Sequence, residues 1–163
     1  MRGNDQVIAY LNEVLKAELT AVNQYFLHAK MCENWGYMRL AAYTQHEAVD
    51  EMKHADKVIQ RLLFLDGSPN MNDMFPIRIG RNVKEQFEND MALELQALPR
   101  LNAGIKVATE AGDNASRSLF EEILKEEEHH VDWLEAQLHM IQEIGYDNYL
   151  AQQMHQGEDA GGH

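Results

Sequence analysis

The chain has 163 residues, a length that suits one domain. It carries 27 acidic against 14 basic side chains, a formal net charge of -13, which argues against nucleic acid or an anionic membrane as a partner. The single cysteine, Cys32, excludes an internal disulfide and a cysteine-based zinc site. The N-terminus is polar and no apolar run approaches the length of a membrane span, so we expect a soluble, cytoplasmic protein.

Helical periodicity predicts four long helices, each bounded by residues that favour helix ends. We expect them at about 4–34, 37–65, 82–111 and 114–145, with a short fifth helix at about 147–153. Gly36 and Gly145 mark two of the C-terminal ends. One domain is expected over 1–156, followed by a disordered tail at 157–163.

The connection between the second and third helices is long, whereas the joints at 34–37 and 112–114 are short and place their helices as antiparallel neighbours. The segment 66–81 reaches roughly 50 Å when extended, and a helix of about 29 residues is ~43 Å long. The sequence therefore predicts an all-α four-helix bundle, in which one long crossover joins two helical hairpins. Pro99, inside the third segment, removes the hydrogen bond to the Leu95 carbonyl. We expect it to kink this helix, because the apolar stripe continues on both sides, and the alternative is that it divides the segment into two helices.

Carboxylates interrupt the apolar stripe near the centre of every long helix. The first and third helices each carry a lone glutamate, and the second and fourth each carry a Glu-x-x-His pair, whose two side chains share a helix face. The six positions, in chain order, are Glu18, Glu51, His54, Glu94, Glu127 and His130. Adding 76 to the first three numbers gives the last three, so the two hairpins contribute the same pattern.

A metal site explains these six residues better than packing does. One glutamate or histidine on an apolar stripe is usually an edge residue or a satisfied core residue. Four carboxylates gathered in a core would cost several kcal/mol in desolvation and repulsion, or would have to take up protons. Two divalent cations would neutralise them. Oxygen-rich sites with one imidazole per metal suit Fe, Mn or Zn, and a carboxylate-rich site favours Fe(III).

Three segments of the sequence resemble the bacterioferritin family. They are NQYFLH at 23–28, DEMKHAD at 50–56 and EEEHHVDWLE at 126–135, and the resemblance extends over nearly the whole chain. It implies the ferritin-like fold and a ferroxidase centre made of the six residues above, with Glu51 and Glu127 bridging two irons. Such a centre oxidises Fe(II) with O₂ or H₂O₂, and the family stores the ferric mineral inside a shell of 24 subunits. His130 separates this family from haem-free ferritins, which usually lack the second histidine.

The resemblance also implies features outside the ferroxidase centre. Met52 corresponds to the ligand of a haem b shared by two subunits, and it points away from the di-iron centre because it follows Glu51 by about 100° around the helix. His46 and Asp50 resemble an iron site on the inner surface of the shell. A ferredoxin that assists iron release would dock near the crossover, whose sequence at 67–81 departs from the family pattern. Co-assembly with a second subunit type stays open.

Two other functions fit parts of the sequence. One is a non-storage di-iron peroxidase of rubrerythrin-like type, although such proteins usually carry a CxxC module, which this sequence lacks. The other is a haem-binding bundle for electron transfer. Such a bundle would have no need of four core carboxylates.

Overall fold

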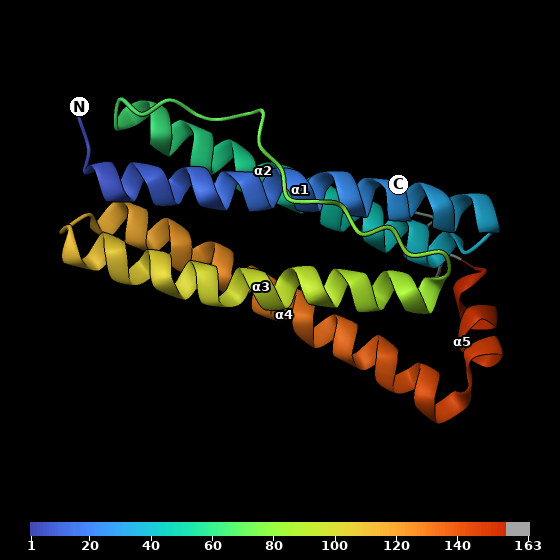
Figure 1. Ribbon diagram of the computed structural model, residues 1–163. Helices are drawn as coiled ribbons and strands as arrows, with labels where there is room; N and C mark the ends of the chain where they lie inside the picture. Colours follow the sequence, from blue (N-terminus) through green and yellow to red (C-terminus); the bar gives the residue numbers. More distant parts are fainter. Residues whose placement is uncertain (156–163) are drawn as a thin grey trace.

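The computed structural model describes residues 1–155 and has five helices in this part of the chain (Figure 1). They are α1 (Asp5–Trp35), α2 (Met38–Phe64), α3 (Val83–Glu110), α4 (Asn114–Ile144) and α5 (Tyr146–Gln153). The first four pack side by side as a four-helix bundle, and α5 lies across one end of it (Figure 1). The predicted fold class and the short fifth helix are confirmed. The expected tail at 157–163 lies outside the described residues.

The helix ends follow from capping side chains. Asn4 precedes α1 and accepts hydrogen bonds from the backbone N–H groups of Gln6 and Val7. Asn82 and Asp113 cap α3 and α4 in the same way. Gly36 ends α1 with a φ of 88°, a left-handed conformation that glycine adopts without steric cost. Local sequence therefore determines where the hairpins turn.

The crossover (residues 65–82) runs along α1 from the end of α2 to the start of α3, at opposite ends of the bundle (Figure 1). Polar side chains of α1 hold its backbone. Thr20 Oγ1 accepts from Phe75 N–H at 2.8 Å, and Gln24 Oε1 accepts from Arg78 N–H at 3.1 Å. His28 Nε2 accepts from Gly80 N–H at 3.0 Å. The predicted crossover is thus fastened along much of α1 by hydrogen bonds between side chains and backbone.

Pro99 lies inside α3, which continues as one helix from Val83 to Glu110. The alternative in which Pro99 divides the segment into two helices is therefore wrong. Pro99 and Leu95 are both on the exposed side of α3. On that side water can replace the hydrogen bond that the Leu95 carbonyl loses, so the proline destabilises the helix less than it would in the core.

The apolar core consists of two large clusters and a small third one made of Ala21, Tyr25 and Ala48. One large cluster contains residues such as Leu11, Val58 and Phe120, and the other contains residues such as Leu40 and Leu134. On α2, α3 and α4 the predicted metal-binding residues fall between these two clusters, and on α1 Glu18 lies within the first cluster's stretch, next to Leu19. The bundle therefore holds a polar centre between apolar ends. None of the described helices is long and apolar enough to cross a membrane.

Candidate metal centre

The structure brings all six predicted metal-binding side chains into the bundle core, where each is buried. Two groups of donor atoms form, and within each group the atoms lie no more than 4.8 Å apart. The first group, which we call site A, is Glu18, Glu51, His54 and Glu127. The second, site B, is Glu94, Glu127 and His130. Glu127 belongs to both groups, so the two sites share one carboxylate.

The distances in site A centre on His54. Its Nδ1 lies 3.3 Å from Glu127 Oε1, 3.4 Å from Glu18 Oε2 and 3.7 Å from Glu51 Oε2. In site B, His130 Nδ1 lies 3.4 Å from Glu94 Oε1. The four carboxylates also line one small cavity of about 10 Å³. The ligand atoms of α1, α2, α3 and α4 therefore converge on one space.

Several polar atoms at this centre are buried without a hydrogen-bond partner among residues 1–155. They are Glu18 Oε2, His54 Nδ1, Glu94 Oε2 and both carboxylate oxygens of Glu127. Buried polar atoms normally have partners, and leaving one unpaired costs about 1–3 kcal/mol. Carboxylate oxygens and imidazole nitrogens aimed at a common point are the donor set of Fe, Mn or Zn. The residues present thus fit a pair of divalent cations.

The crowding of carboxylates changes their proton affinity. Burial, with Glu18 nearby, raises the pKa of Glu51 well above its ordinary value. Burial also raises the pKa of Glu127 strongly, with help from the charges of Glu51 and Glu94. Burial acts to raise the pKa of Glu94 as well, but interactions with Glu127, His130 and Tyr25 outweigh it, and the net shift is downward. Without a cation, protons must therefore neutralise part of the centre.

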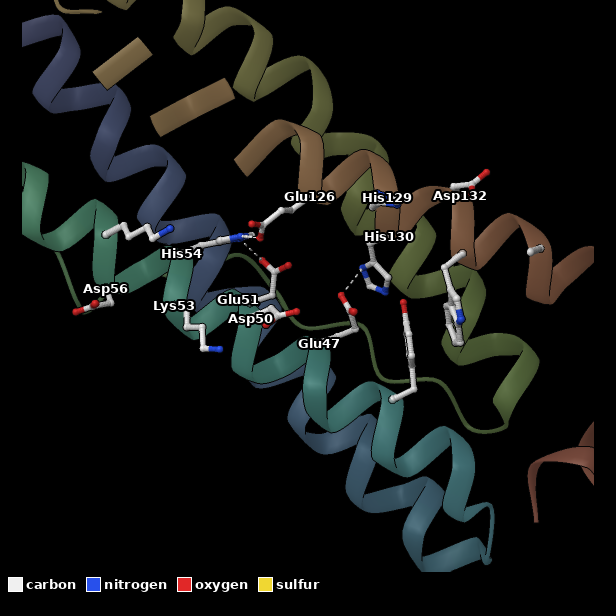
Figure 2. Close-up of a pocket in the computed structure, with 14 residues that line it drawn as sticks. Glu47, Asp50, Glu51, Lys53, His54, Asp56, Glu126, His129, His130 and Asp132 are labelled. Atoms are coloured by element: carbon white, nitrogen blue, oxygen red, sulfur yellow. Dashed lines mark hydrogen bonds and ion pairs between the residues drawn. The ribbon is translucent and has the colours of Figure 1, made fainter. Parts of the chain in front are cut away.

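A cavity of about 750 Å³ opens beside the centre, between α2 and α4 (Figure 2). Its walls carry further acids and histidines, among them Glu47, Asp50, Glu126 and His129. Glu47 Oε2 lies 3.7 Å from His130 Nδ1, and burial raises the pKa of Glu47. This cavity gives the centre an acidic approach from one face of the subunit.

Three contacts of the centre were not predicted from the sequence. Glu126 contacts the Nε2 atom of His54, Glu47 faces His130, and the hydroxyl of Tyr25 donates a hydrogen bond to Glu94. Glu47 lies about one helical turn before Glu51 on α2. Its spacing of four residues from Glu51 is the only signal that points to it.

The other predicted site residues lie on the surface of α2. Met52 is 51% exposed, next in sequence to the buried Glu51. His46 Nε2 lies 3.4 Å from Asp50 Oδ2, and the His46 side chain is 67% exposed. These three residues therefore do not join sites A and B, in agreement with their expected places outside the centre.

Comparisons with known proteins agree with this fold. Residues 8–144 match the family model of the ferritin-like domain. A bacterioferritin of Streptomyces coelicolor is 48% identical over 151 residues, which cover 93% of this chain and 90% of the relative. Bacterioferritins of Mycolicibacterium paratuberculosis and Brucella melitensis are 46% and 44% identical, over 93% and 91% of this chain and 96% and 92% of their own lengths. The chain therefore belongs to the bacterioferritins, within the ferritin-like family.

Proposed function

We propose that this protein stores iron and acts as a ferroxidase, binding Fe(II) as its substrate at sites A and B and oxidising it to Fe(III). One observation carries the proposal: two buried carboxylate and histidine donor sets share Glu127. The names of the bacterioferritins that match nearly the whole chain support the same function.

The roles of the residues follow from their positions. Glu18 and His54 would complete site A, Glu94 and His130 would complete site B, and Glu51 and Glu127 would bridge the two ions. Four carboxylates balance the charge of two divalent cations. Tyr25 fixes the orientation of Glu94 by donating a hydrogen bond from its hydroxyl group to that carboxylate.

The number of electrons exchanged in the oxidation matches a pair of Fe(II) ions. Each Fe(II) gives up one electron on becoming Fe(III). O₂ takes up two electrons and two protons to form H₂O₂, or H₂O₂ takes up two electrons and two protons to form two water molecules. Two adjacent ions therefore supply what either oxidant needs in one encounter, and a single ion would not.

The ferric product needs a place to accumulate. We propose that 24 copies of the chain form a closed shell, with the cavity between α2 and α4 facing its interior. Asp50 lines that cavity, and it forms with His46 an exposed pair through which iron would pass to the mineral. A ferredoxin that binds near the crossover would supply electrons for release. We also place the protein in the cytoplasm.

The half-exposed thioether of Met52 fits a haem b held between two subunits. A methionine that its own bundle leaves at the surface, with the exposed Val49 one turn before it, is free to reach a ligand shared with a second copy. When bound, a haem supplies one-electron transfer between the shell and a donor outside it.

The shared carboxylate gives the sharpest test of the ferroxidase. Glu127→Gln keeps the shape of the side chain but removes a charge from both donor sets, so we expect the rate of Fe(II) oxidation to fall by at least about tenfold. The measurement is the growth of Fe(III) absorbance after anaerobic Fe(II) loading and addition of oxidant. Glu128→Gln, at the exposed neighbouring position, is the control. A native rate in Glu127→Gln would contradict the assignment.

A further inference from the structure

His54 lies between two sets of carboxylates, one on each side of its ring. Its Nδ1 atom faces the buried oxygens of site A at 3.3 to 3.7 Å. Its Nε2 atom contacts a carboxylate oxygen of Glu126, on the cavity side (Figure 2). The two nitrogens of the ring therefore face different groups. Nδ1 faces the carboxylates of site A, and Nε2 faces Glu126.

Glu126 makes this contact in a cavity that is also lined by lysine side chains. Lys57, which lines the same cavity, forms its ion pair with Glu122, one helical turn before Glu126 on α4. Glu126 is half exposed, whereas the side chain of His54 is 3% exposed. An outer carboxylate thus reaches inward to a buried ring.

Site B lacks an equivalent arrangement. Both ion pairs of His130 within residues 1–155 use Nδ1, the same atom that faces Glu94 and Glu47. Aromatic rings surround its ring instead: Tyr25 at 5.1 Å, Trp133 at 6.3 Å and Tyr43 at 6.4 Å between centroids. Ring contacts restrict the position of His130, but they do not determine which of its nitrogens carries the proton.

We propose that Glu126 is a positioning residue for His54, and that it makes site A the tighter of the two metal sites. By accepting a hydrogen bond from Nε2–H, Glu126 keeps the proton on that nitrogen and leaves the lone pair of Nδ1 for the metal. The inference rests on the proposed function, because it assumes that both donor sets bind metal.

Anaerobic titration of the metal-free, full-length assembly with Co(II) tests the inference without any turnover. The d–d absorption of Co(II) reports the ligands of each bound ion, and calorimetry gives the affinities. We expect the native protein to bind in two steps, the tighter at site A. Loss of an outer carboxylate partner of a metal-binding histidine typically costs 10- to 100-fold in affinity, so Glu126→Ala should weaken the tighter step by about that factor.

Two further variants separate positioning from charge. The amide oxygen of glutamine accepts the same hydrogen bond, so Glu126→Gln should keep most of the affinity that Glu126→Ala loses. Glu128→Ala removes the same charge from an exposed position about 200° around α4 from Glu126, and it should leave both steps unchanged. Melting followed by circular dichroism checks that each variant is folded.

The outcomes distinguish this inference from the proposed function. If Glu126→Ala binds Co(II) in two steps like the native chain, the positioning role is wrong while the metal centre stands. If Glu126→Gln is as weak as Glu126→Ala, charge alone accounts for the effect and positioning is again wrong. If the native chain binds no Co(II) and Glu127→Gln oxidises Fe(II) at the native rate, the proposed function itself fails.

Discussion

Protons and metal ions compete for the same oxygens at the centre of this bundle. Glu51 and Glu127 have pKa values raised by burial and by neighbouring carboxylates. Burial acts to lower the pKa of His130, but its hydrogen bond and ion pair with Glu94 raise it. In the folded, metal-free protein these groups hold protons that the unfolded chain would release. The residues that suit a cation thus make the protein sensitive to pH when the cation is missing.

This linkage predicts how the melting temperature of the metal-free protein changes with pH. Glutamates in the unfolded chain titrate near 4.5, whereas folded Glu51 and Glu127 titrate higher. The folded state binds more protons in that interval, so its stability falls as pH rises through it. We expect Tm of the chelator-treated protein to fall as pH rises above about 4.5, the ordinary pKa of glutamate.

Two comparisons isolate the cause of that fall. Glu51→Gln, which cannot ionise, should flatten the dependence of Tm on pH. Added Co(II) should reverse it, because metal binding strengthens as its ligands lose protons. A Tm of the metal-free protein that rises with pH over the same range would contradict the linkage.

Close backbone contacts as well as side chains hold the crossover in place. Gly80 comes so close to the start of α3 that an added Cβ would stand 2.3 Å from the backbone nitrogen of Gln86. Its N–H donates to His28, and His28 Nδ1 lies 2.9 Å from Asp90 Oδ1. The approach of the crossover to α3 therefore depends on the absence of a side chain at position 80.

We expect Gly80→Ala to lower the free energy of unfolding by about 1–3 kcal/mol, the usual cost of forcing an extra carbon into a packed site. The measurement is Tm at a fixed subunit concentration. Arg81→Ala is the control, because the Arg81 side chain is 89% exposed and its removal should change stability by less than about 0.5 kcal/mol. Equal Tm values for the two variants would show that the crossover can move away from α3.

The same elements indicate how far sequence reasoning reaches. Periodicity and caps locate every helix to within a few residues. The apolar stripe, which repeats every three or four positions, also locates the six buried residues proposed to bind metal, because they lie on it. The contact between Glu126 and His54 joins residues 72 apart in sequence, and no periodic signal encodes it. Thr20, Gln24 and His28 do repeat every four residues beside the stripe. Their partners are backbone groups of an irregular segment, so the spacing alone predicts a polar face and not a fastened crossover.

In the proposed 24-subunit shell, Met52 would link one subunit to the next through a shared haem. Purified native particles should elute as a 24-subunit shell and show the Soret band of a bound haem. Met52→Ala should remove the band, because the iron would lose its thioether ligand. Met140→Ala, which changes another exposed methionine, should keep it. A full Soret band in Met52→Ala would contradict the role of Met52.

The two hairpins of the bundle each contribute one lone glutamate and one Glu-x-x-His pair. Neither hairpin alone contains the complete set of ligands, because site A draws Glu127 from the second hairpin and its other three residues from the first. Metal ions bound at sites A and B would therefore hold the two hairpins together, in addition to taking part in the oxidation reaction. The number of metal ions bound per subunit therefore reports whether the two hairpins are packed together. A subunit whose hairpins have separated loses site A and cannot retain the pair of cations.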